Sequence, residues 1–348
     1  MEAVTQPPKK TNRIGLELAT YRGSKTTLCA GCGHNAISER IIDAFYELGT
    51  DPKRVIKLSG IGCSSKTPAY FLNYSHGFNA LHGRMPSVAT GALVANGRLL
   101  GLGISGDGDT ANIGIGQFKH ACRRNLPMLY IVEDNGCYGL TKGQFSATAD
   151  LNARLHGQKG DPNPNPPFDL CLEAIAAGAT FVARSFAGDR KQLLPLLKAG
   201  LRHRGSAVID IISPCVTFNN HEDSTKSYPY GKANEDRLHD ITFIPKYDEI
   251  KVDYEEGTTL TVELHEGPAI QLKKLDREYD PTNAVSAIKL LMEAQEKREF
   301  ITGLVYIDTK KATLQDTLNL PEMPLAHFQE DRLRPPREAL DKLMQEMM

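Results

Sequence analysis

Apolar residues occur along the chain in two alternating patterns, stretches with helical spacing and short continuous runs. From residue 35 to 49 the apolar positions share one face of a helix, which we expect to end at Gly49. The run RVIKLSG that follows predicts a short buried strand. The alternation continues, with further strands expected at 98–109, 128–136, 180–185 and 207–213 and helices at 111–124, 171–178 and 189–205.

Strands that alternate with helices predict an α/β fold, a doubly wound and mostly parallel sheet with helices on both faces. In such sheets ligands bind at the carboxyl ends of the strands. The glycine and acidic clusters of this chain fall at those predicted ends. The segment 156–169 is rich in Pro, Gly and Asn, and we expect it to form a surface loop.

After about residue 245 the pattern changes. It predicts a hairpin over 258–275, an amphipathic helix over 284–300 and a terminal helix over 338–348. We therefore expect a ligand-binding domain at 1–245 and a small C-terminal α+β extension at 246–348, in which no chemistry is evident.

The composition makes several classes of function less plausible for this chain. The 348 residues carry 41 Lys and Arg against 42 Asp and Glu, so no strong field favours nucleic acid or an anionic membrane as a partner. The first fifteen residues lack the apolar core of a secretory signal, and no run approaches the ~18 apolar residues that span a bilayer. We expect a cytoplasmic protein. Seven cysteines do not suggest a disulfide framework.

The stretch TLCAGCGH places Cys29 and Cys32 three positions apart. A c-type haem would need a histidine directly after the second cysteine, but Gly33 precedes His34. The pair also lies before the first predicted strand, which does not fit a thioredoxin-like redox motif. A structural zinc site usually brings a second close pair, and the other five cysteines stand singly.

An iron–sulfur cluster takes four thiolates, which distant loops can supply. Cys63 and Cys215 each follow a predicted strand, so both are expected at the same sheet edge. Cys122 lies in a predicted helix and Cys171 at the start of one, and we interpret both as small buried apolar residues. Cys137 lies near the expected ligand edge. Spacing alone leaves the cluster and a zinc site open.

Acidic residues follow two neighbouring strands. The GDG motif at 106–108 places Asp107 at a strand end, and the backbone N–H groups of Asp109 and Thr110 lead into a helix, where a diphosphate can bind. Asp134 and Asn135 follow the next strand. Mg²⁺ prefers such oxygen ligands together with a diphosphate. Helix capping and an Asn-Gly turn would explain a single cluster, but two clusters favour a metal–diphosphate site.

GDG followed by a strand end with asparagine is typical of thiamine diphosphate enzymes. Together with CAGCGH, SGIGCSSK, HGRMPSVATG, YGLTKGQFSATAD and PCVTFNN, it makes the chain resemble the beta subunits of 2-oxoacid:ferredoxin oxidoreductases over about Thr26 to Asn220. The 2-oxoglutarate type is the most similar. The resemblance implies CoA-dependent oxidative decarboxylation of 2-oxoglutarate to succinyl-CoA and CO₂, or the reverse, with electrons passing through a [4Fe-4S] cluster to ferredoxin.

The resemblance also assigns residues. The cluster ligands would be Cys29, Cys32, Cys63 and Cys215. The side chains of Asp107 and Asn135 and the carbonyl of Cys137 would hold Mg²⁺. Besides Asp107 and Asn135, the residues that bind thiamine diphosphate would be Gly60, Ile61, Gly62, His82, Gly106, Gly108, Asp109, Thr110, Gly139 and Leu140.

Two lysines match positions at which the family contacts its substrate. Lys66 would lie near the 2-oxoacid carboxylate, and Lys142 would face the distal carboxylate of 2-oxoglutarate. Solvated surface cations are the alternative for both. His34, His82 and Arg84 lie in glycine-rich loops and either line the cofactor or are ordinary hydrogen-bonded residues.

Two positions depart from the family pattern. Ala30 stands where proline is common, and Asp134 stands where asparagine is usual. Neither departure removes a ligand, although Asp134 adds a negative charge near the metal.

The resemblance implies that the thiamine site is completed by a separate α subunit in an α₂β₂ assembly, with coenzyme A as cosubstrate and ferredoxin as acceptor. Three alternatives stay open. The chain could belong to an enzyme for pyruvate or for 2-oxoacids in general. It could be a non-redox thiamine enzyme, which would bind no iron. It could also be a non-catalytic iron–sulfur or zinc module, which would bind no thiamine.

Overall fold

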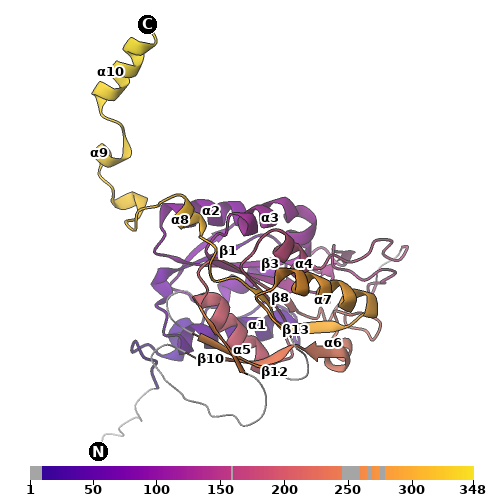
Figure 1. Ribbon diagram of the computed structural model, residues 1–348. Coiled ribbons are helices and arrows are strands. Elements are labelled where there is room, and N and C mark those ends of the chain that lie inside the picture. The colour runs from indigo at the N-terminus through magenta and orange to yellow at the C-terminus, as the bar shows by residue number, and fades with distance from the viewer. Residues whose placement is uncertain (1–9, 158–159, 245–258, 265–268, 275–278) are drawn as a thin grey trace, which may run out of the picture.

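The computed structural model describes residues 10–157, 160–244, 259–264, 269–274 and 279–348 (Figure 1). Within them, eight strands form a central sheet in the order β2-β1-β3-β4-β8-β7-β13-β9. These strands are β1 (Val55–Ser59), β2 (His76–Asn79), β3 (Leu100–Gly106), β4 (Met128–Asp134), β7 (Phe181–Phe186), β8 (Ser206–Ile212), β9 (Glu235–Arg237) and β13 (Phe300–Ile307).

The sheet is mostly parallel. Every neighbouring pair from β2 to β7 runs parallel, whereas β13 is antiparallel to β7 and parallel to β9. Strands β4, β7 and β8 are buried along their whole length, which is why they appear in the sequence as continuous apolar runs. The expected doubly wound α/β fold is confirmed.

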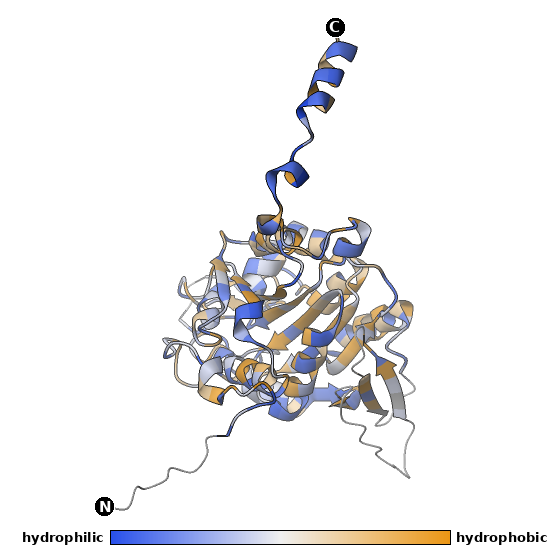
Figure 2. Cartoon of the chain, turned by 90° about the vertical axis from the view of Figure 1, so that its left-hand side faces the viewer, coloured by the Kyte–Doolittle hydropathy of each residue, from blue (hydrophilic) through white to orange (hydrophobic). Residues whose placement is uncertain are grey.

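Two hydrophobic cores lie on the two faces of the sheet, and in Figure 2 its central strands are largely hydrophobic. One face is covered by α1 (Gly33–Glu47), α5 (Arg190–Arg202) and a small antiparallel sheet of β10 (His239–Ile244), β12 (Ala269–Lys274) and β11 (Thr259–Glu263). The other face is covered by α2 (Met85–Ala95), α3 (Ile115–Arg123), α4 (Leu170–Ala176) and α7 (Ala284–Lys297).

The segment expected to form a C-terminal extension contributes to the main fold. Strand β13 lies between β7 and β9 in the central sheet, and α7 packs beside α4. The predicted hairpin is confirmed in the described residues by the antiparallel pairing of β11 with β12, and α7 confirms the predicted amphipathic helix. Helix α6 (Tyr228–Asn234) precedes β9.

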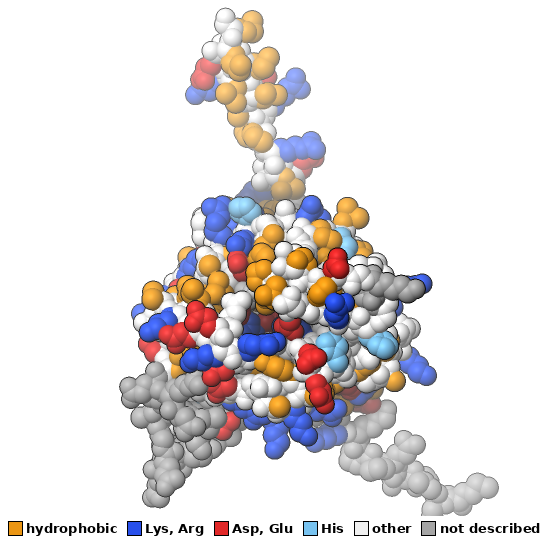
Figure 3. All heavy atoms as spheres, turned by 90° about the vertical axis from the view of Figure 1, so that its right-hand side faces the viewer, with side chains coloured by type: hydrophobic (Ala, Val, Ile, Leu, Met, Phe, Trp, Pro, Cys, Tyr) orange, Lys and Arg blue, Asp and Glu red, His pale blue; other side chains and the backbone are white. Residues whose placement is uncertain are grey.

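The chain ends in an arm that stands off the body (Figures 1 and 2). It follows α8 (Leu314–Thr317) and contains α9 (Glu330–Leu333) and α10 (Arg337–Glu346). Neither α9 nor α10 has a buried residue, and Figure 3 shows hydrophobic side chains gathered on α10. None of the helices in the described part of the chain combines the length and apolar content needed to cross a bilayer.

One helix begins differently from the prediction. The turn after the GDG motif, η4 (Gly108–Ile113), is a π-helical turn, and α3 starts only at Ile115. The wider turn places the Asp109 carboxylate against the backbone N–H of Gly83, at 2.7 Å. π-Helical turns are frequent at functional sites.

Candidate functional site

The carboxyl ends of β1, β3 and β4 surround a hollow of about 50 Å³, which we call the GDG hollow. Because these strands are parallel and adjacent, the loops that follow them meet at one edge of the sheet. All the residues expected to bind thiamine diphosphate line this hollow except Gly60 and Thr110: Ile61, Gly62, His82, Gly106, Asp107, Gly108, Asp109, Asn135, Gly139 and Leu140.

Asp107 follows β3 and is buried beside a second carboxylate. Its Oδ2 accepts hydrogen bonds from the backbone N–H of Gly136 at 3.0 Å, from Thr148 Oγ1 at 2.6 Å and from the Ser146 hydroxyl. Thr148 Oγ1 also lies 2.6 Å from Asp134 Oδ1. One hydroxyl proton serves only one of these acceptors at a time. Burial raises the pKa of Asp107 and raises that of Asp134 to about 7. A bound cation would offset the closeness of the two carboxylates.

Asn135 connects the loop after β4 to the loop after β8. Its Oδ1 accepts a hydrogen bond from the backbone N–H of Cys137 at 3.1 Å, and its carbonyl accepts one from Asn219 Nδ2 at 2.9 Å. The Tyr138 hydroxyl donates to the carbonyl of Gly108 at 3.0 Å. The predicted metal-binding residues are therefore held together by hydrogen bonds between their own loops.

The Asp109 carboxylate braces the loops around the hollow. It accepts hydrogen bonds from Ser105 Oγ at 2.6 Å and from the backbone N–H of Gly83 at 2.7 Å, and it contacts the ring of His82. A Cβ at Gly60 would overlap this carboxylate, so a residue with a side chain does not fit there.

Thr110 is fully buried and lies outside the hollow lining. Its Oγ1 is 3.1 Å from the hydroxyl of Tyr130. The side chains of Asp109 and Thr110 thus have structural partners, and the binding of a diphosphate by their backbone N–H groups stays a prediction.

The four predicted cluster ligands come together. Cys29, Cys32, Cys63 and Cys215 line a second hollow of about 80 Å³, the cysteine hollow. The first two precede α1, Cys63 follows β1, and Cys215 follows β8. Among the described residues, no three His, Cys, Asp or Glu side chains are close enough to hold a single metal ion. A [4Fe-4S] cluster instead spreads its four thiolates over four irons.

Neighbouring groups lower the pKa of the Cys215 thiol to about 6. Hydrogen bonding with the Cys137 side chain is the largest cause, and the backbone of residues 217–219 acts in the same direction. Burial raises the pKa of Cys32 to about 12 and also raises that of Cys63. Thr217 Oγ1 donates to Cys29 Sγ at 3.6 Å.

The two hollows share a wall, since His34, Cys63, Asn135 and Gly139 line both. His34 Nδ1 is hydrogen-bonded to the Ser213 hydroxyl and lies 3.6 Å from Glu133 Oε2. Glu133 is 0% exposed, and neither of its carboxyl oxygens has a hydrogen-bond partner in the described structure. Burial lowers the pKa of His34 to about 4 and raises that of Glu133 well above its ordinary value, so burial disfavours the charged form of both side chains.

The two predicted substrate lysines lie in different surroundings. Lys66, in η3 (Ser64–Ala69), lines the cysteine hollow and not the GDG hollow. Lys142 is exposed in the turn between β5 (Cys137–Tyr138) and β6 (Gln144–Phe145). Its neighbour Thr141 lines the GDG hollow, but Lys142 does not.

Arg84 stands at the N-terminus of α2 and lines neither hollow. Its Nη1 donates a hydrogen bond to the carbonyl of Gly83 at 3.4 Å. Of the three residues expected either to line the cofactor or to be ordinary hydrogen-bonded residues, His34 and His82 therefore line the GDG hollow, whereas Arg84 does not.

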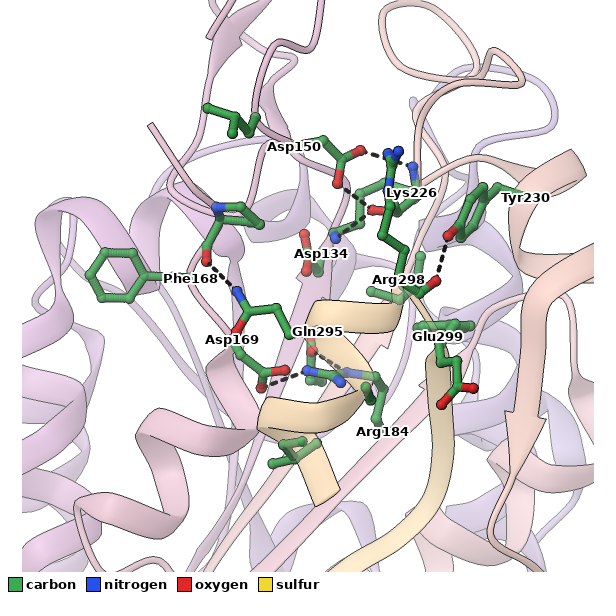
Figure 4. A pocket seen from close by; sticks show the side chains of 18 of the residues that line it. Asp134, Asp150, Phe168, Asp169, Arg184, Lys226, Tyr230, Gln295, Arg298 and Glu299 are labelled. Atoms are coloured by element: carbon green, nitrogen blue, oxygen red, sulfur yellow. Dashed lines mark hydrogen bonds and ion pairs between the residues drawn. The ribbon is translucent and has the colours of Figure 1, made fainter. Parts of the chain in front are cut away.

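A larger hollow, of about 420 Å³, lies elsewhere (Figure 4). Arg184 spans its floor, with Nε 2.9 Å from Asp210 and Nη2 2.8 Å from Asp169. Figure 4 shows Lys226 and Asp150 across the hollow from this ion pair, and Figure 3 shows side chains of both charges on the surrounding face. Asp134 lines this hollow, but none of the residues that the resemblance assigns to a cofactor does, so we assign it no cofactor.

Several residues of the site were not predicted. Ser146, Thr148, Glu133 and Asn219 were not named as site residues from the sequence. A signal existed for three of them, because the motifs YGLTKGQFSATAD and PCVTFNN contain Ser146, Thr148 and Asn219.

Two family models match the chain. The first, described as thiamine pyrophosphate enzyme, C-terminal TPP binding domain, matches residues 60–211. The second, which describes the C-terminal part of the pyruvate ferredoxin oxidoreductase beta subunit, matches residues 270–321. The first range includes the loops after β1, β3 and β4 that form the GDG hollow.

Individual proteins are similar over longer ranges. A 2-oxoacid:ferredoxin oxidoreductase subunit beta from Sulfolobus sp is 40% identical over 233 residues, 67% of this chain and 74% of the relative. The 2-oxoglutarate synthase subunit KorB from Methanocaldococcus jannaschii is 38% identical over 194 residues, 55% of this chain and 69% of the relative.

A solved structure is also similar. The 2-oxoglutarate:ferredoxin oxidoreductase from Magnetococcus marinus, with 2-oxoglutarate, coenzyme A and succinyl-CoA bound, superposes with a TM-score of 0.71 at 28% identity. The match covers 90% of this chain and 92% of the other.

Proposed function

Because the chain belongs to the family of 2-oxoacid:ferredoxin oxidoreductase beta subunits, we propose that it works with an α subunit on 2-oxoglutarate. The reaction is CoA-dependent oxidative decarboxylation to succinyl-CoA and CO₂, or its reverse, with ferredoxin as electron acceptor. Relatives named for 2-oxoglutarate and the structural match with bound 2-oxoglutarate and succinyl-CoA support this substrate. The observation that carries the proposal is the wall that the GDG and cysteine hollows share.

The GDG hollow fits Mg²⁺ and thiamine diphosphate. Asp107, Asn135 and the carbonyl of Cys137 would hold the metal, and the backbone after the GDG motif would hold the diphosphate. Two buried carboxylates that compete for one hydroxyl proton form a setting that a divalent cation stabilises. Neither carboxyl oxygen of Glu133 has a hydrogen-bond partner in the described structure, so the same hollow lacks donors for a second buried acidic group. Thiamine diphosphate, when bound, supplies the electron sink for loss of CO₂.

The cysteine hollow fits a [4Fe-4S] cluster. Cys29, Cys32, Cys63 and Cys215 converge on it from three loops, and the lowered pKa of Cys215 favours its thiolate form. A cluster held here would be separated from the thiamine site by the side chains of the shared wall. Such proximity suits the transfer of electrons one at a time.

The choice of 2-oxoacid would depend on Lys142. We assign it to the distal carboxylate of 2-oxoglutarate, and we assign Lys66, beside the cysteine hollow, to the 2-oxoacid carboxylate. The second candidate is a pyruvate or broad 2-oxoacid enzyme. The match of residues 270–321 to a pyruvate ferredoxin oxidoreductase segment favours it.

As a beta subunit, the chain has an α subunit as its partner, and we propose an α₂β₂ assembly. The mouth of the GDG hollow is apolar and open, since Ile61 and Leu140 are both exposed and line it. Phe78 in β2 and Leu81 in the loop that leads to His82 are also exposed. A subunit docked over these residues would exclude water from the reacting carbons.

The test is a cofactor analysis of the chain purified without oxygen together with its α subunit. We expect about four irons, about four acid-labile sulfides and one thiamine diphosphate per beta chain. We also expect CoA-dependent reduction of ferredoxin by 2-oxoglutarate. Thiamine without iron would favour a non-redox thiamine enzyme, and iron without thiamine would favour an electron-transfer module. Faster turnover of pyruvate than of 2-oxoglutarate would favour the second candidate.

A further inference from the structure

The hollow of about 420 Å³ has no part in the proposed function (Figure 4). We call it the α7 hollow, because residues of α7 form one of its walls. It lies where β4 and β8 end, since Asp134 and Ile212, the last residues of these strands, both line it. Ligands bind at such strand ends, and small-molecule sites have volumes of about 300–1,000 Å³. Its position and size are therefore those of a ligand site.

One end of the α7 hollow, the Arg184 end, has more negative than positive charge. Arg184 Nε lies 2.9 Å from Asp210 Oδ2, and Arg184 Nη2 lies 2.8 Å from Asp169 Oδ1. All three side chains line the hollow. One guanidinium group thus faces two carboxylates, which leaves an excess of one negative charge.

Asp210 lacks a partner at this end. Its side chain is 1% exposed, and its Oδ1 has no hydrogen bond to any residue that the structure describes. Burial raises the pKa of Asp210 to about 7, so Arg184 does not fully offset the loss of water around this carboxyl. Buried polar atoms nearly always have a partner. An unpaired carboxyl oxygen in the lining of a hollow therefore indicates that a donor is missing.

The opposite end, the Lys226 end, has the same imbalance. Lys226 Nζ donates to Thr225 Oγ1 at 3.0 Å, and Thr225 Oγ1 donates to Asp150 Oδ1 at 2.6 Å. Asp134 lies beside Lys226 in Figure 4. Burial lowers the pKa of Lys226, but the charges of Asp134 and Asp150 bring it above its ordinary value. One ammonium group again faces two carboxylates.

The rest of the lining adds no net charge. Arg298 and Glu299 also line the hollow, and their charges cancel. Buried apolar side chains complete the walls, namely Ile212, Leu291, Ala294 and Phe300. The described lining thus has an excess of two negative charges, one at each end, together with apolar surface.

A metal ion does not fit this arrangement. In the described ranges of the chain, no three His, Cys, Asp or Glu side chains lie close enough together to hold one. The two acidic ends also lie across the hollow from each other (Figure 4). A ligand that offsets both excess charges has to carry two cationic groups joined by an apolar chain.

We propose that the α7 hollow binds a linear diamine, with one ammonium group at the Arg184 end and the other at the Lys226 end. The methylene groups between them contact the apolar side chains of the walls. This inference goes beyond the proposed function, because it uses none of the residues that are assigned there to a cofactor or to the substrate.

The test is titration calorimetry on the assembly with the α subunit, at constant ionic strength. The probes are 1,4-diaminobutane and 1,6-diaminohexane, with n-butylamine as the control that carries one ammonium group. We expect the better diamine to bind 10- to 100-fold more tightly than n-butylamine, because its second ammonium group adds hydrogen bonds to charged groups. Diamines that bind no more tightly than n-butylamine would overturn the inference. Displacement of the diamine by an equal concentration of Mg²⁺ would also overturn it, in favour of a metal site.

Variants locate the binding. Asp210→Asn removes the excess charge of the Arg184 end, and Asp150→Asn removes that of the Lys226 end. We expect each to weaken diamine binding 10- to 100-fold, to about the affinity of n-butylamine. Glu293→Gln is the matched control, because it removes one negative charge from an exposed position of α7 that does not line the hollow.

The two variants change different elements, so one of them decides the question if the other does not fold. Diamine affinity that both variants retain would overturn the inference, and so would an equal decrease in Glu293→Gln. Iron and thiamine are measured on the same samples. A failure of the proposed function is therefore distinguished from a failure of this inference.

Discussion

Lys142 has a backbone conformation that its neighbours impose. Its φ is 77°, in the left-handed region that residues with a side chain rarely adopt. Its backbone N–H donates to the carbonyl of Gly139 at 3.3 Å, and Gly143, at a φ of 96°, closes the turn against Phe218. Such a conformation persists only where the surroundings stabilise it, and it is common at sites that hold a ligand.

Lys142→Ala should raise KM for 2-oxoglutarate far more than KM for 2-oxobutyrate, which has no distal carboxylate. Loss of one hydrogen bond to a charged group costs about 1.5–3 kcal/mol, so we expect a difference of roughly 10- to 100-fold. Lys289→Ala, at an exposed lysine of α7, is the control. Steady-state kinetics with both substrates measure the effect, and equal increases in KM for the two would contradict the role.

Thr148 is expected to orient the metal-binding carboxylate, because its hydroxyl contacts both Asp107 and Asp134. Thr148→Val should weaken Mg²⁺-dependent binding of thiamine diphosphate about 10-fold, since loss of a residue that orients a ligand usually costs 10- to 100-fold in metal affinity. Titration calorimetry with Mg²⁺ and thiamine diphosphate measures this. Unchanged affinity would mean that the backbone N–H of Gly136 and the Ser146 hydroxyl hold Asp107 sufficiently.

Residues that follow strands could be located from the sequence, but their partners could not. Asp107 and Asn135 were expected at one edge because parallel neighbours bring their carboxyl ends together. Thr148 and Asn219 lie in long loops, and the periodicity of the sequence does not indicate the path of such loops. Glu133 could not be identified as a site residue for another reason. It is an acidic residue inside the apolar run MLYIVED, and the run does not indicate which of the two cores its side chain faces.

At the scale of elements, continuous apolar runs predicted β1, β3, β4, β7 and β8 within a few residues. The helix α2 and the short strand β2 were not predicted. Helix α2 is apolar on most of its surface, so it shows little amphipathic periodicity, and β2 is exposed along its length. The position of β13 in the sheet could not be predicted, because the pairing of β13 with β7 depends on long-range packing.

Strand β1 supports the loop that carries Cys63 and Lys66. Lys57 is buried in β1, and its Nζ donates to the carbonyls of Pro68 and Phe71, both at 2.6 Å, at the end of η3. Burial lowers the pKa of Lys57 to about 8. This ammonium group therefore holds a loop that lines both hollows, at the cost of its own desolvation.

Lys57→Met should reduce the free energy of unfolding by about 2 kcal/mol, because two carbonyls lose their donor. Between pH 8 and the ordinary lysine pKa of 10.5, the unfolded chain binds a proton that the folded chain has released. Wild-type stability should therefore rise with pH in this window relative to the variant. Urea unfolding at pH 7.5 and 10 measures both effects, and a difference that does not change with pH would contradict the pKa direction.

For the whole molecule, the end of the chain has two unlike parts. Strand β13 is nearly fully buried inside the central sheet. The arm beyond residue 328 buries no residue of α9 or α10, and Leu340, Leu343 and Met344 on α10 are all more than half exposed. The stability of the body should depend on the first part and not on the second.

A chain ending at Phe328 should keep the Tm of the full chain within about 2 °C, because surface changes alter stability by less than about 0.5 kcal/mol. A chain ending at Lys297 lacks β13 and should lose cooperative unfolding, since β7 would lose one of its two neighbours and α7 the strand on which it packs. Differential scanning calorimetry of the three chains measures this. A large decrease in Tm for the chain that ends at Phe328 would show that the arm packs on the body.

The late position of β13 has a consequence for biosynthesis. Strand β7 is complete at Phe186 and has β8 on one side, but its neighbour on the other side, β13, begins only at Phe300. At roughly 5–20 residues per second, the intervening segment takes on the order of ten seconds to leave the ribosome. During that interval the nascent chain presents an unpaired strand edge, the kind of surface on which chains associate with one another. Heterologous production should therefore benefit from slower translation at low temperature or from chaperones that bind ribosome-attached chains.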